Sequence, residues 1–587
     1  PTHVSAAKSV KAYCDPVLFS KPHVYADFLR RLDEGGMLRW TKANGKQGCL
    51  GVFFVAKKDG SLRLIFDTRV LNASFGTPPK TQLPSAAAFS AIECDPDAKF
   101  FFGSFDVRNA FYVLGIPDDL SDMFTMPVIS NKFFNFPSLN GESVGSEDML
   151  LPCLKVLPMG WSWSLHLCQL FTSSIAARII PCARMILDRK AGVVLNKKGE
   201  PVYFGPACAV YVDNIGIAGT DKLEVDTTLS LINQEFIDLG LQTHENFGAS
   251  EESEFIGLEF RFGYVSIKRK RLWTIRLALL CLLRRGCCSG QMLEAVVGHC
   301  TWAMLVRREG LSIFSCVYKF IRENYLVHVK FDAEIIKELK LAVALLPLFR
   351  ASVHARWSSS LHASDASPFG LGVCHRHCDA KIIREIGCQS ERWRFRIEDA
   401  VHARRRALVN TEHALVDKNN ASLPPIISVE NRALTNEESE FVSTSHGLRS
   451  FLEVDPNLLV PSDWVVVHGS FHPHKEHITK TEGRALVLAV KHALRSAGNR
   501  SKRLLFLVDN MALCLAATKG RSSSPLLTSV VRHLCALSFA TGSRFWFRWI
   551  PSELNIADHP SRGKRLDGTP IDCLVDNTPL PLQPTNF

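Results

Sequence analysis

Two aspartates roughly a hundred residues apart each lie at the end of an apolar segment. Asp106 follows the run 100–105, and Asp213 lies in the short sequence Tyr211-Val212-Asp213-Asn214. Short apolar runs bounded by polar residues are typical of buried strands, so both carboxylates are expected at strand ends. Two carboxylates brought together can hold Mg²⁺ against a triphosphate. The pair therefore indicates phosphoryl-transfer chemistry.

Four further carboxylates lie in the C-terminal third of the chain. Asp365 lies among small residues in a segment that begins a strand, and Glu482 lies on the apolar face of a predicted helix. Asp509 ends a wholly apolar run, which is typical of a buried interior strand with a site at its end. The segment 549–562 supplies Asp558. Strand, helix, strand and helix start would each contribute one acidic side chain.

The surrounding pattern predicts the elements that position these residues. Residues 52–56 and 62–66 are predicted to form a basic hairpin across an Asp-Gly turn. Residues 207–212 and 215–218 are predicted to form a second hairpin, whose turn residues Asp213 and Asn214 tolerate unusual φ angles. Long aliphatic patterns with helical spacing follow at 274–285, 291–306 and 333–348, and strand patterns return from Trp357.

Composition bounds the kind of protein. At 587 residues the chain is too long for one core, and a prior of roughly 150 residues per domain predicts about three to five domains. Apolar residues make up 46% and charged residues 22%, so most of the chain should fold. Lys and Arg exceed Asp and Glu by 11. A basic run is often only a solvated face, but these clusters also suit a polyanion: 268–271, 284–285, 307–308 and 404–406.

The 18 cysteines form no regular framework, which predicts reduced thiols in a cytoplasmic or nuclear protein. The group 374–378, with Cys388, has zinc-binding residue types but lacks paired Cys-x-x-Cys spacing, so no metal is expected there. No run of 18 uncharged apolar residues occurs, so no membrane span is expected. The chain begins at Pro1 without a Met or a signal segment, and we expect that it was cut from a longer polypeptide.

The first half of the chain resembles the reverse transcriptases of retroelements. Five motifs follow one another in family order: the hairpin 55–72, the segment around Asp106, residues 157–162, the turn with Asp213, and residues 255–258. The resemblance implies that Asp106, Asp213 and the main-chain carbonyl of Val107 bind two divalent ions, with Asn214 beside them. It implies that Lys57, Lys58 and Arg63 neutralise the incoming phosphates. It further implies contacts to nucleotide or nucleic acid from Phe111 beneath the sugar, Met159, Gly160 near the template base pair, and Ile256 and Gly257 at the turn that grips the primer.

Three positions depart from the family pattern. Asn214 replaces a second aspartate, which removes one negative charge from the metal site. Met159 stands where retroviral relatives often have Gln. No clear counterpart exists for the lysine thought to protonate the leaving pyrophosphate; His244 could substitute, although a solvated histidine is the simpler interpretation.

The order Asp365, Glu482, Asp509, Asp558 resembles ribonuclease H. Four such side chains can hold two Mg²⁺ about 4 Å apart, one activating water and one stabilising the departing oxygen. The ending 555–562 resembles retroelement versions, including those of the DIRS kind with tyrosine recombinases. The long separation between Asp365 and Glu482 requires an insertion, and the histidine that some relatives place before the last aspartate is absent, with Glu553 nearby.

Together these resemblances imply an α+β and α/β multidomain fold: a right-hand polymerase with fingers, palm and thumb, a connection, and an RNase H-like α/β domain. The expected boundaries are 1–39 for an N-terminal extension, 40–262 for fingers and palm, 263–350 for a helical thumb and connection, 351–565 for the RNase H-like domain with an insertion at about 398–460, and 566–587 for a tail.

The implied function is RNA- and DNA-directed DNA synthesis with RNase H activity, within an LTR/gypsy-like or DIRS-like retrotransposon polyprotein. The implied cofactors are Mg²⁺ or Mn²⁺, two ions in each site. The implied partners are an RNA template, a DNA primer, an RNA:DNA hybrid and dNTPs, with no membrane. A fused protease, integrase or recombinase would belong to the parent polyprotein.

Two alternatives remain open. A domesticated RNA-binding scaffold could keep the same folds without catalysis, and Asn214 favours it, whereas the costly clusters of like charge argue against it. An integrase shares the RNase H topology, but it would show three acidic residues with the last ones farther into a helix.

Overall fold

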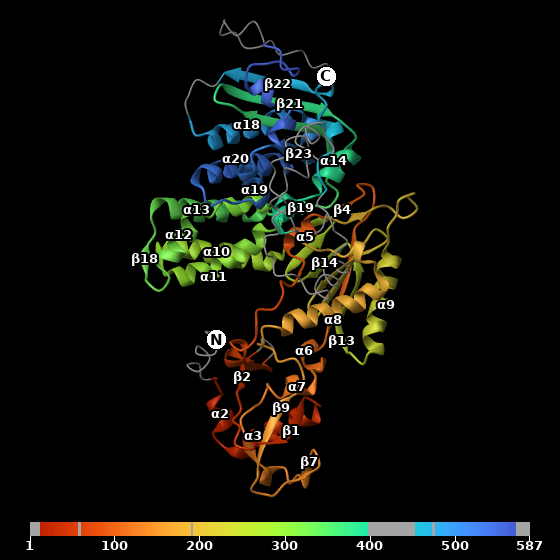
Figure 1. The fold of residues 1–587 in the computed structure, drawn as a ribbon, viewed down its shortest axis with the longest axis vertical. Coiled ribbons are helices and arrows are strands. Elements are labelled where there is room, and N and C mark those ends of the chain that lie inside the picture. The colour runs from red at the N-terminus through yellow and green to blue at the C-terminus, as the bar shows by residue number, and fades with distance from the viewer. Residues whose placement is uncertain (1–11, 57–59, 189–191, 397–451, 472–475, 571–587) are drawn as a thin grey trace, which may run out of the picture.

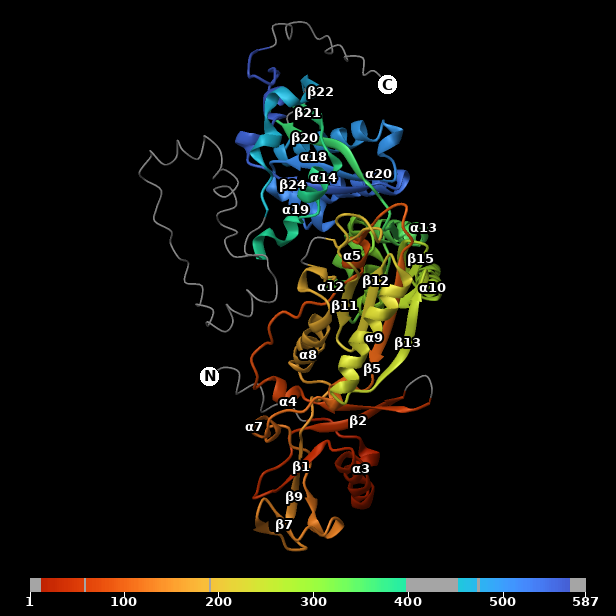
Figure 2. The ribbon, with the colours of Figure 1, turned by 90° about the vertical axis from the view of Figure 1, so that its right-hand side faces the viewer.

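The computed structural model describes residues 12–56, 60–188, 192–396, 452–471 and 476–570 of the chain. Its elements form an elongated mixed α/β arrangement, with the N-terminal elements at one end and a five-stranded sheet at the other (Figure 1). A second sheet and a group of helices lie between these ends, as the turned view in Figure 2 also shows.

The N-terminal end is built from short strands around a buried core. A three-stranded sheet has the order β1-β9-β6, with β1 at Leu38–Lys42, β9 at Met149–Leu154 and β6 at Ile129–Ser130. A separate hairpin pairs β2 (Gly51–Ala56) with β3 (Leu62–Asp67). The other elements here are α2 (Pro16–Phe19), α3 (Pro22–Glu34), α4 (Arg69–Asn72), α7 (Asp118–Ser121), β7 (Ser138–Leu139) and β8 (Glu142–Ser143).

The central sheet has the order β11-β12-β5-β13. Its strands are β5 (Phe101–Val107), β11 (Ala207–Tyr211), β12 (Asn214–Gly219) and β13 (Thr243–Ser250). Side chains alternate across β5, so that Phe105 and Val107 join the N-terminal core while Phe102 joins a second core on the opposite face. Nearby elements are α5 (Ala86–Ser90), β4 (Glu93–Cys94), α6 (Ala110–Val113), α8 (Ser164–Ile179), β10 (Val194–Leu195) and α9 (Lys222–Asp238).

The second core continues without a break into a helical region. It joins the sheet β14-β15-β16-β19, made of Glu252–Phe255, Leu258–Arg261, Tyr264–Ile267 and Arg350–Ser352, to the helices that follow. These helices are α10 (Arg269–Arg285), α11 (Gly290–Met304), α12 (Cys316–Glu323) and α13 (Ala333–Leu345), with the short strands β17 (Cys287–Cys288) and β18 (Val329–Lys330) and the 3-10 helix η3 (Arg308–Ser312). The helical region and the central sheet therefore form one packed unit.

The C-terminal region contains a sheet of order β22-β21-β20-β23-β24. β20 (Trp357–Ala366) pairs parallel to β23 (Arg503–Val508), which pairs parallel to β24 (Arg544–Trp549). β21 (Gly370–His377) and β22 (Val465–Phe471) complete the sheet in antiparallel pairing. Alternate residues of β23 enter two cores, one on each face, beneath α14 (Ala380–Gly387), α18 (Ile478–Ala493), α19 (Met511–Lys519) and α20 (Pro525–Thr541); α21 (Asp558–Ser561) follows β24.

One buried ion pair holds an edge of this sheet. Arg548 of β24 donates from Nε to Glu391 Oε1 at 2.9 Å, and both side chains are fully buried. Arg548 also donates to the carbonyl of Ile386 and to the carbonyl of Leu452. Glu391 begins the 3-10 helix η5 (Glu391–Arg396), so this arginine joins a segment before residue 397 to one after residue 451.

The predicted strands and helices agree with these elements, with one correction. The hairpin over 52–66 and the helices near 274–285, 291–306 and 333–348 are present, and no helix within the described ranges is long and apolar enough to cross a membrane. The prediction that Asp213 and Asn214 form the turn of the second hairpin is wrong. Asn214 is the first residue of β12 and pairs with Tyr211, so the turn residues are Val212 and Asp213. Most of the predicted insertion lies at 397–451, outside the described residues, and the domain boundaries remain predictions.

Candidate active sites

The first site is the turn that carries Asp213. Gln169 of α8 is buried, accepts a hydrogen bond from the Val212 amide at 2.7 Å and donates to the Val210 carbonyl at 3.0 Å. Val212 has a φ of 59°, which is unusual for a β-branched residue. The side chain of Gln169 therefore holds the backbone that leads into this strained residue.

Asp106 lies directly beside this turn. It pairs with Asn214 across β5 and β12, and the amide of the next residue, Val107, donates to the Asp213 carbonyl at 2.9 Å. Oδ1 of Asp106 is buried and has no hydrogen-bond partner in the part of the chain that the structure describes. Burial, with the nearby Asp213 charge, raises the pKa of Asp106 to about 7, and burial also raises the pKa of Asp213. The structure thus brings together the two aspartates that the sequence paired.

Asn214 and His244 border the two carboxylates. The Asn214 side-chain amide donates to Asp213 Oδ1 at 2.8 Å. His244 pairs with Asp106 across β5 and β13, and its Nε2 lies 4.0 Å from Asp106 Oδ2. The histidine weighed as a substitute for the missing lysine therefore lies at the site, and a positive charge on it lowers the pKa of Asp106.

Some of the residues predicted to contact the nucleotide lie near Asp106 and Asp213, and others fall outside the described residues. Arg63 of β3 is close enough for its charge to lower the pKa of Asp213, whereas Lys57 and Lys58 lie outside the described residues. Phe111 is half-buried in α6, and the next residue, Tyr112, donates from its hydroxyl to the Leu64 carbonyl at 2.8 Å. That bond ties α6 to the β2–β3 hairpin, so Arg63 and Phe111 approach the turn from linked elements.

Met159 and Gly160 lie where the chain passes the β2–β3 hairpin. The Met159 carbonyl accepts from the Phe66 amide at 3.3 Å. Gly160 has a φ of 127°, and a Cβ there would lie 2.4 Å from the Phe66 carbonyl oxygen. The need for glycine is explained by this close approach within the chain itself. A contact with template remains a prediction.

Ile256 and Gly257 form the turn between β14 and β15, with φ angles of 42° and 86°. A Cβ on Gly257 would lie 2.9 Å from Arg271 Nη1 of α10. Of the predicted residues, these two lie at the junction with the helical region, and their role at a primer is not tested by the geometry.

The second site lies at one end of the C-terminal sheet. Asp365 of β20, Glu482 of α18 and Asp509 after β23 each offer a carboxylate oxygen, and these oxygens all lie within 4.8 Å of one another. Parallel pairing of β20 with β23 brings Asp365 and Asp509 to the same edge, and α18 packs across β20 to add Glu482. Three of the four predicted acidic residues therefore converge.

Burial and mutual repulsion dominate the electrostatics of this cluster. Burial, with the charges of Asp509 and Asp365, raises the pKa of Glu482 to about 9. Burial and the Asp509 charge raise the pKa of Asp365 to about 7, although Ser561 donates to its Oδ2 at 2.6 Å. Burial also raises the pKa of Asp509. Its buried Oδ1 has no hydrogen-bond partner among the residues that the structure describes.

Asp558 stands apart from the other three acidic residues. It is not among the carboxylates that converge within 4.8 Å, and its Oδ1 accepts from Arg562 Nε and Nη2 at 3.0 and 2.9 Å. Its charge still raises the pKa of Asp365 and of Glu482. Asp558 is therefore near the cluster but paired with its own arginine.

Both sites suit divalent cations by their donor chemistry. Hard carboxylate oxygens are the ligands that Mg²⁺ prefers, and the unpartnered oxygens of Asp106 and Asp509 are buried polar atoms that need a partner. Raised carboxylate pKa values mark places where a cation would relieve repulsion. The residues therefore fit the expected metal ions.

Sequence reasoning missed several supporting residues. Gln169 carries no motif, and only the fold shows that its helix passes behind the turn. Ser561 and Arg562 lie in the C-terminal motif, but the sequence does not show that one serves Asp365 and the other Asp558. The Cys and His group at 374–378 lies mostly in β21, which pairs with β20. Cys374 enters one core, while His375 packs on the other face against His362 and His492, with ring centroids 6.0 and 5.8 Å away.

Comparison with known proteins gives a structural likeness alone. No protein-family model matches the sequence, and no curated protein matches it. The chain is similar to a foamy viral protease-reverse transcriptase solved with an RNA/DNA hybrid, at 13% identity and a TM-score of 0.40, over 95% of this chain and 78% of that one. It is also similar to the foamy viral enzyme solved with dsDNA, at 13% identity and a TM-score of 0.40, over 89% of this chain and 82% of that one. A variant labelled dRH, also with dsDNA, matches at 12% identity and a TM-score of 0.41, over 88% of this chain and 68% of that one.

Proposed function

We propose that this chain is a nucleotidyltransferase with two active sites: an RNA- and DNA-directed DNA polymerase and a ribonuclease H. The observation that carries the proposal is that one pair and one triad of partly or fully buried carboxylates lie in separate parts of the chain, and each contains a buried oxygen without a hydrogen-bond partner among the described residues. A structural role would not retain two such clusters, because buried like charges cost stability.

In the polymerase site, Asp106 and Asp213 would hold the divalent ions, with the Val107 carbonyl beside them. Bound divalent ions lower the pKa of an attacking hydroxyl or water and stabilise the leaving oxygen, in this site and in the nuclease site alike. Arg63 would contact the triphosphate through paired hydrogen bonds, and Lys57 or Lys58 would add a mobile positive charge. His244, next to Asp106, could donate a proton to the leaving pyrophosphate.

Around that site, Phe111 would pack against the sugar and exclude a 2′-hydroxyl. Met159 and Gly160 would approach the template base pair, and Ile256 and Gly257 would contact the primer. dNTPs, an RNA or DNA template and a DNA primer are the implied ligands.

In the nuclease site, Asp365, Glu482 and Asp509 would hold the ions, and Asp558 would join them when it separates from Arg562. Ser561 orients Asp365 by its hydrogen bond. The substrate would be the RNA strand of an RNA:DNA hybrid, recognised by its 2′-hydroxyls while the DNA strand is held by phosphate contacts.

We further propose an origin in the polyprotein of an LTR/gypsy-like or DIRS-like retrotransposon acting in the cytoplasm or nucleus. Free cysteines throughout the described chain are compatible with such a reducing compartment. A flanking protease, integrase or tyrosine recombinase in the parent reading frame would distinguish the two element types.

The test is primer extension on RNA and DNA templates, and cleavage of an RNA:DNA hybrid, with Mg²⁺ or Mn²⁺. Asp213→Asn should abolish extension and leave cleavage unchanged, and Asp509→Asn should do the reverse. Asp238→Asn, an exposed residue at the end of α9, is the matched control and should change neither activity. Loss of both activities in either single variant, with the fold intact, would contradict two independent sites.

The alternative is a catalytically inactive RNA-binding scaffold, favoured by one observation: the Asn214 amide already occupies one oxygen of Asp213. A scaffold should bind RNA with equal affinity with and without divalent ions and should show neither activity. Extension by the unmodified protein that Asp213→Asn removes would exclude this alternative.

A further inference from the structure

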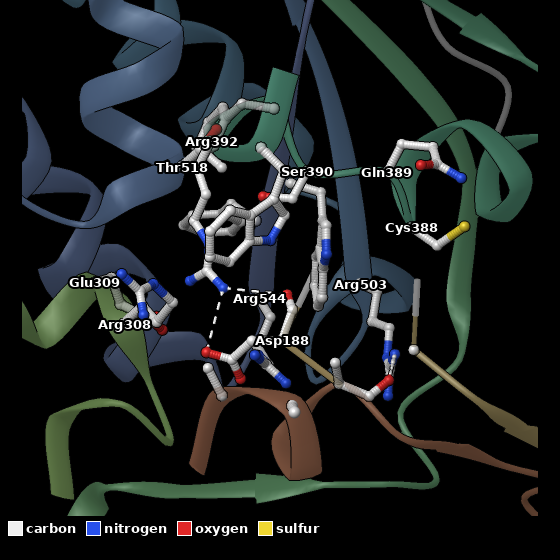
Figure 3. A pocket seen from close by; sticks show the side chains of 18 of the residues that line it. Asp188, Arg308, Glu309, Cys388, Gln389, Ser390, Arg392, Arg503, Thr518 and Arg544 are labelled. Atoms are coloured by element: carbon white, nitrogen blue, oxygen red, sulfur yellow. Dashed lines mark hydrogen bonds and ion pairs between the residues drawn. The ribbon is translucent and has the colours of Figure 1, made fainter. Parts of the chain in front are cut away.

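A cavity lies where the C-terminal sheet meets the central part of the molecule. Its volume is about 140 Å³, and its walls come from α5, from residues 186–188, from the start of η3, and from β23, β24 and α19 (Figure 3). It is separate from both carboxylate sites, because none of their six acidic residues lines it.

Arginines outnumber carboxylates around this cavity. Arg308, Arg392, Arg503 and Arg544 line it, with three acidic residues, and two further arginines bind those same acids from behind. The ion pairs are Arg503 and Arg384 with Glu93 at 3.1 and 2.8 Å, Arg307 with Glu309 at 2.7 Å, and Arg392 with Asp188 at 3.8 Å. Each carboxylate is therefore already engaged.

Arg308 and Arg544 are left without a carboxylate. Neither has a carboxylate oxygen of a described residue within 4.0 Å, whereas every other arginine lining the cavity does. The Nε of Arg308 is buried and has no hydrogen-bond partner among the described residues, and its Nη2 donates to the Lys519 carbonyl at a long distance of 3.4 Å. Arg544 donates to the Ser90 carbonyl and hydroxyl, which are both uncharged, and lies over the Trp546 ring at 4.9 Å.

These two groups are held in an environment that disfavours their charge. Burial and the adjacent Arg392 lower the pKa of Arg308 to about 9, and burial lowers the pKa of Arg544 to about 9. Guanidinium groups nevertheless remain cationic at neutral pH. The charge of Glu309 offsets part of the shift in both groups, but six guanidinium groups around three carboxylates leave positive charge that an added anion would neutralise.

We propose that this cavity binds a small phosphate-bearing anion, held between Arg308 from η3 and Arg544 from β24. A carboxylate would neutralise only one of the two cations, whereas a phosphate group carries about −1.5 to −2 at pH 7 and offers three strong acceptor oxygens. Planar guanidinium forks match those oxygens in paired hydrogen bonds. Ser390, which also lines the cavity, brings a hydroxyl group to the same space, whereas the Thr518 hydroxyl already donates to the Cys514 carbonyl at 2.8 Å.

Such an anion would join two parts of the chain that are distant in sequence. η3 lies within the helical region, between α11 and α12, and β24 is an edge strand of the C-terminal sheet, so a ligand that contacts both resists their separation. Arg307 and Arg532 already bridge the same boundary, through Ser538 and through Glu338. The inference does not rest on the proposed enzymatic activities, because neither carboxylate site takes part.

The test uses the full chain in a chelating buffer, so that no divalent ion can carry phosphate to the carboxylate sites. Isothermal titration with pyrophosphate, and with inorganic phosphate, should show saturable binding that chloride at equal ionic strength does not reproduce. The variant Arg308→Gln, Arg544→Gln should weaken binding at least tenfold. Arg322→Gln, an exposed residue on α12, is the matched control and should bind as the unmodified chain does.

A milder substitution controls for the possibility that the double variant does not fold. Arg308→Lys keeps the charge but loses the planar fork, and it should weaken binding several-fold without lowering Tm in phosphate-free buffer. The proposal is overturned if the unmodified chain does not bind either phosphate, or if the double variant binds both as tightly as Arg322→Gln does. Because activity is not measured, failure of this proposal leaves the proposed function untouched, and the reverse also holds.

Discussion

The two carboxylate sites both bring negatively charged groups close together, but they differ in what surrounds those groups. At the central sheet, two aspartates share the site with a neutral Asn214 and a histidine, and the pKa of Asp106 is raised to about 7. In the C-terminal sheet, three acidic groups crowd within 4.8 Å, and the pKa of Glu482 is raised to about 9. At the first site, the side chain of Gln169 holds the backbone of the turn in shape. At the second site, the raised pKa values favour protonated carboxyl groups, and a bound cation would displace those protons. Substitutions that remove the support of the turn should therefore affect the first site, and substitutions that remove a carboxylate charge should affect the second.

The largest difference should come from removing the support of the turn. Gln169→Leu leaves the Val210 carbonyl and the Val212 amide buried without partners, each costing about 1–3 kcal/mol, and frees the turn that holds Asp213. Primer extension should fall about 100-fold, a change of about 2.7 kcal/mol in activation free energy, while hybrid cleavage is unchanged. Single-turnover extension measures this loss.

Two further variants show that the effect is one of positioning. Gln169→Glu keeps the acceptor for the Val212 amide and should recover part of the rate, whereas Gln234→Leu on the exposed face of α9 should have no effect. Equal extension by Gln169→Leu and the unmodified chain would mean that the turn keeps its shape unaided.

The next effect is a difference in how the two sites make the unfolding free energy depend on pH. Glu482 has a folded-state pKa of about 9 against an ordinary 4.5, so the folded state binds the extra proton between these values and stability falls as pH rises through them. Asp106 has released its proton near pH 7. From pH 7 to 9 the chelated protein should lose about 2 kcal/mol of unfolding free energy, with a slope near 1.4 kcal/mol per pH unit at pH 7 that falls to about half of that at pH 9.

Urea unfolding at pH 7, 8 and 9 in chelating buffer measures that slope. Glu482→Gln should flatten it and Asp106→Asn should not, while excess Mg²⁺ should flatten it in the unmodified chain. A slope that survives in Glu482→Gln would assign it to another group.

A smaller effect concerns sugar selection, which belongs to the polymerase site alone. Phe111→Val shortens the ring expected against the sugar without touching Asp106 or Asp213. Ribonucleotide incorporation should rise about tenfold relative to deoxynucleotide incorporation, within the ~1–3 kcal/mol that steric exclusion supplies. Single-nucleotide extension with paired rNTP and dNTP series gives the ratio, and an unchanged ratio would leave Phe111 as a packing residue.

The smallest effect should come from making the two sites more alike. Asn214→Asp adds a negative charge beside Asp213 and should lower the Mg²⁺ concentration needed for half-maximal extension by a few-fold, equivalent to less than about 1 kcal/mol. A Mg²⁺ titration of the extension rate measures it, with cleavage in the same samples as the internal reference. Loss of extension would show that the turn depends on the hydrogen bond that the Asn214 side-chain amide donates to the Asp213 carboxylate.

How far the sequence predicts these sites depends on how local their determinants are. Asp106, Asp509 and the hairpin around Asp213 follow from apolar runs that end in a carboxylate, and strand pairing then brings the acids together. The turn was placed one residue late, because the positive φ falls on Val212, a residue that rarely adopts it, and a distant glutamine stabilises it. Asp558 and Arg562 have the i, i+4 spacing that favours an ion pair on a helix, and this signal could have shown that Asp558 is engaged.

The Arg548 anchor has a consequence for chain entropy. One buried guanidinium holds both the carboxylate of Glu391 and the main chain at Leu452, so two points that are 61 residues apart in the sequence are fixed side by side. The free energy of closing a loop between fixed ends changes by only about 0.6 kcal/mol for each halving or doubling of its length. The closure term is therefore only weakly sensitive to the length of chain between Glu391 and Leu452, whereas loss of Arg548 would release both fixed points together.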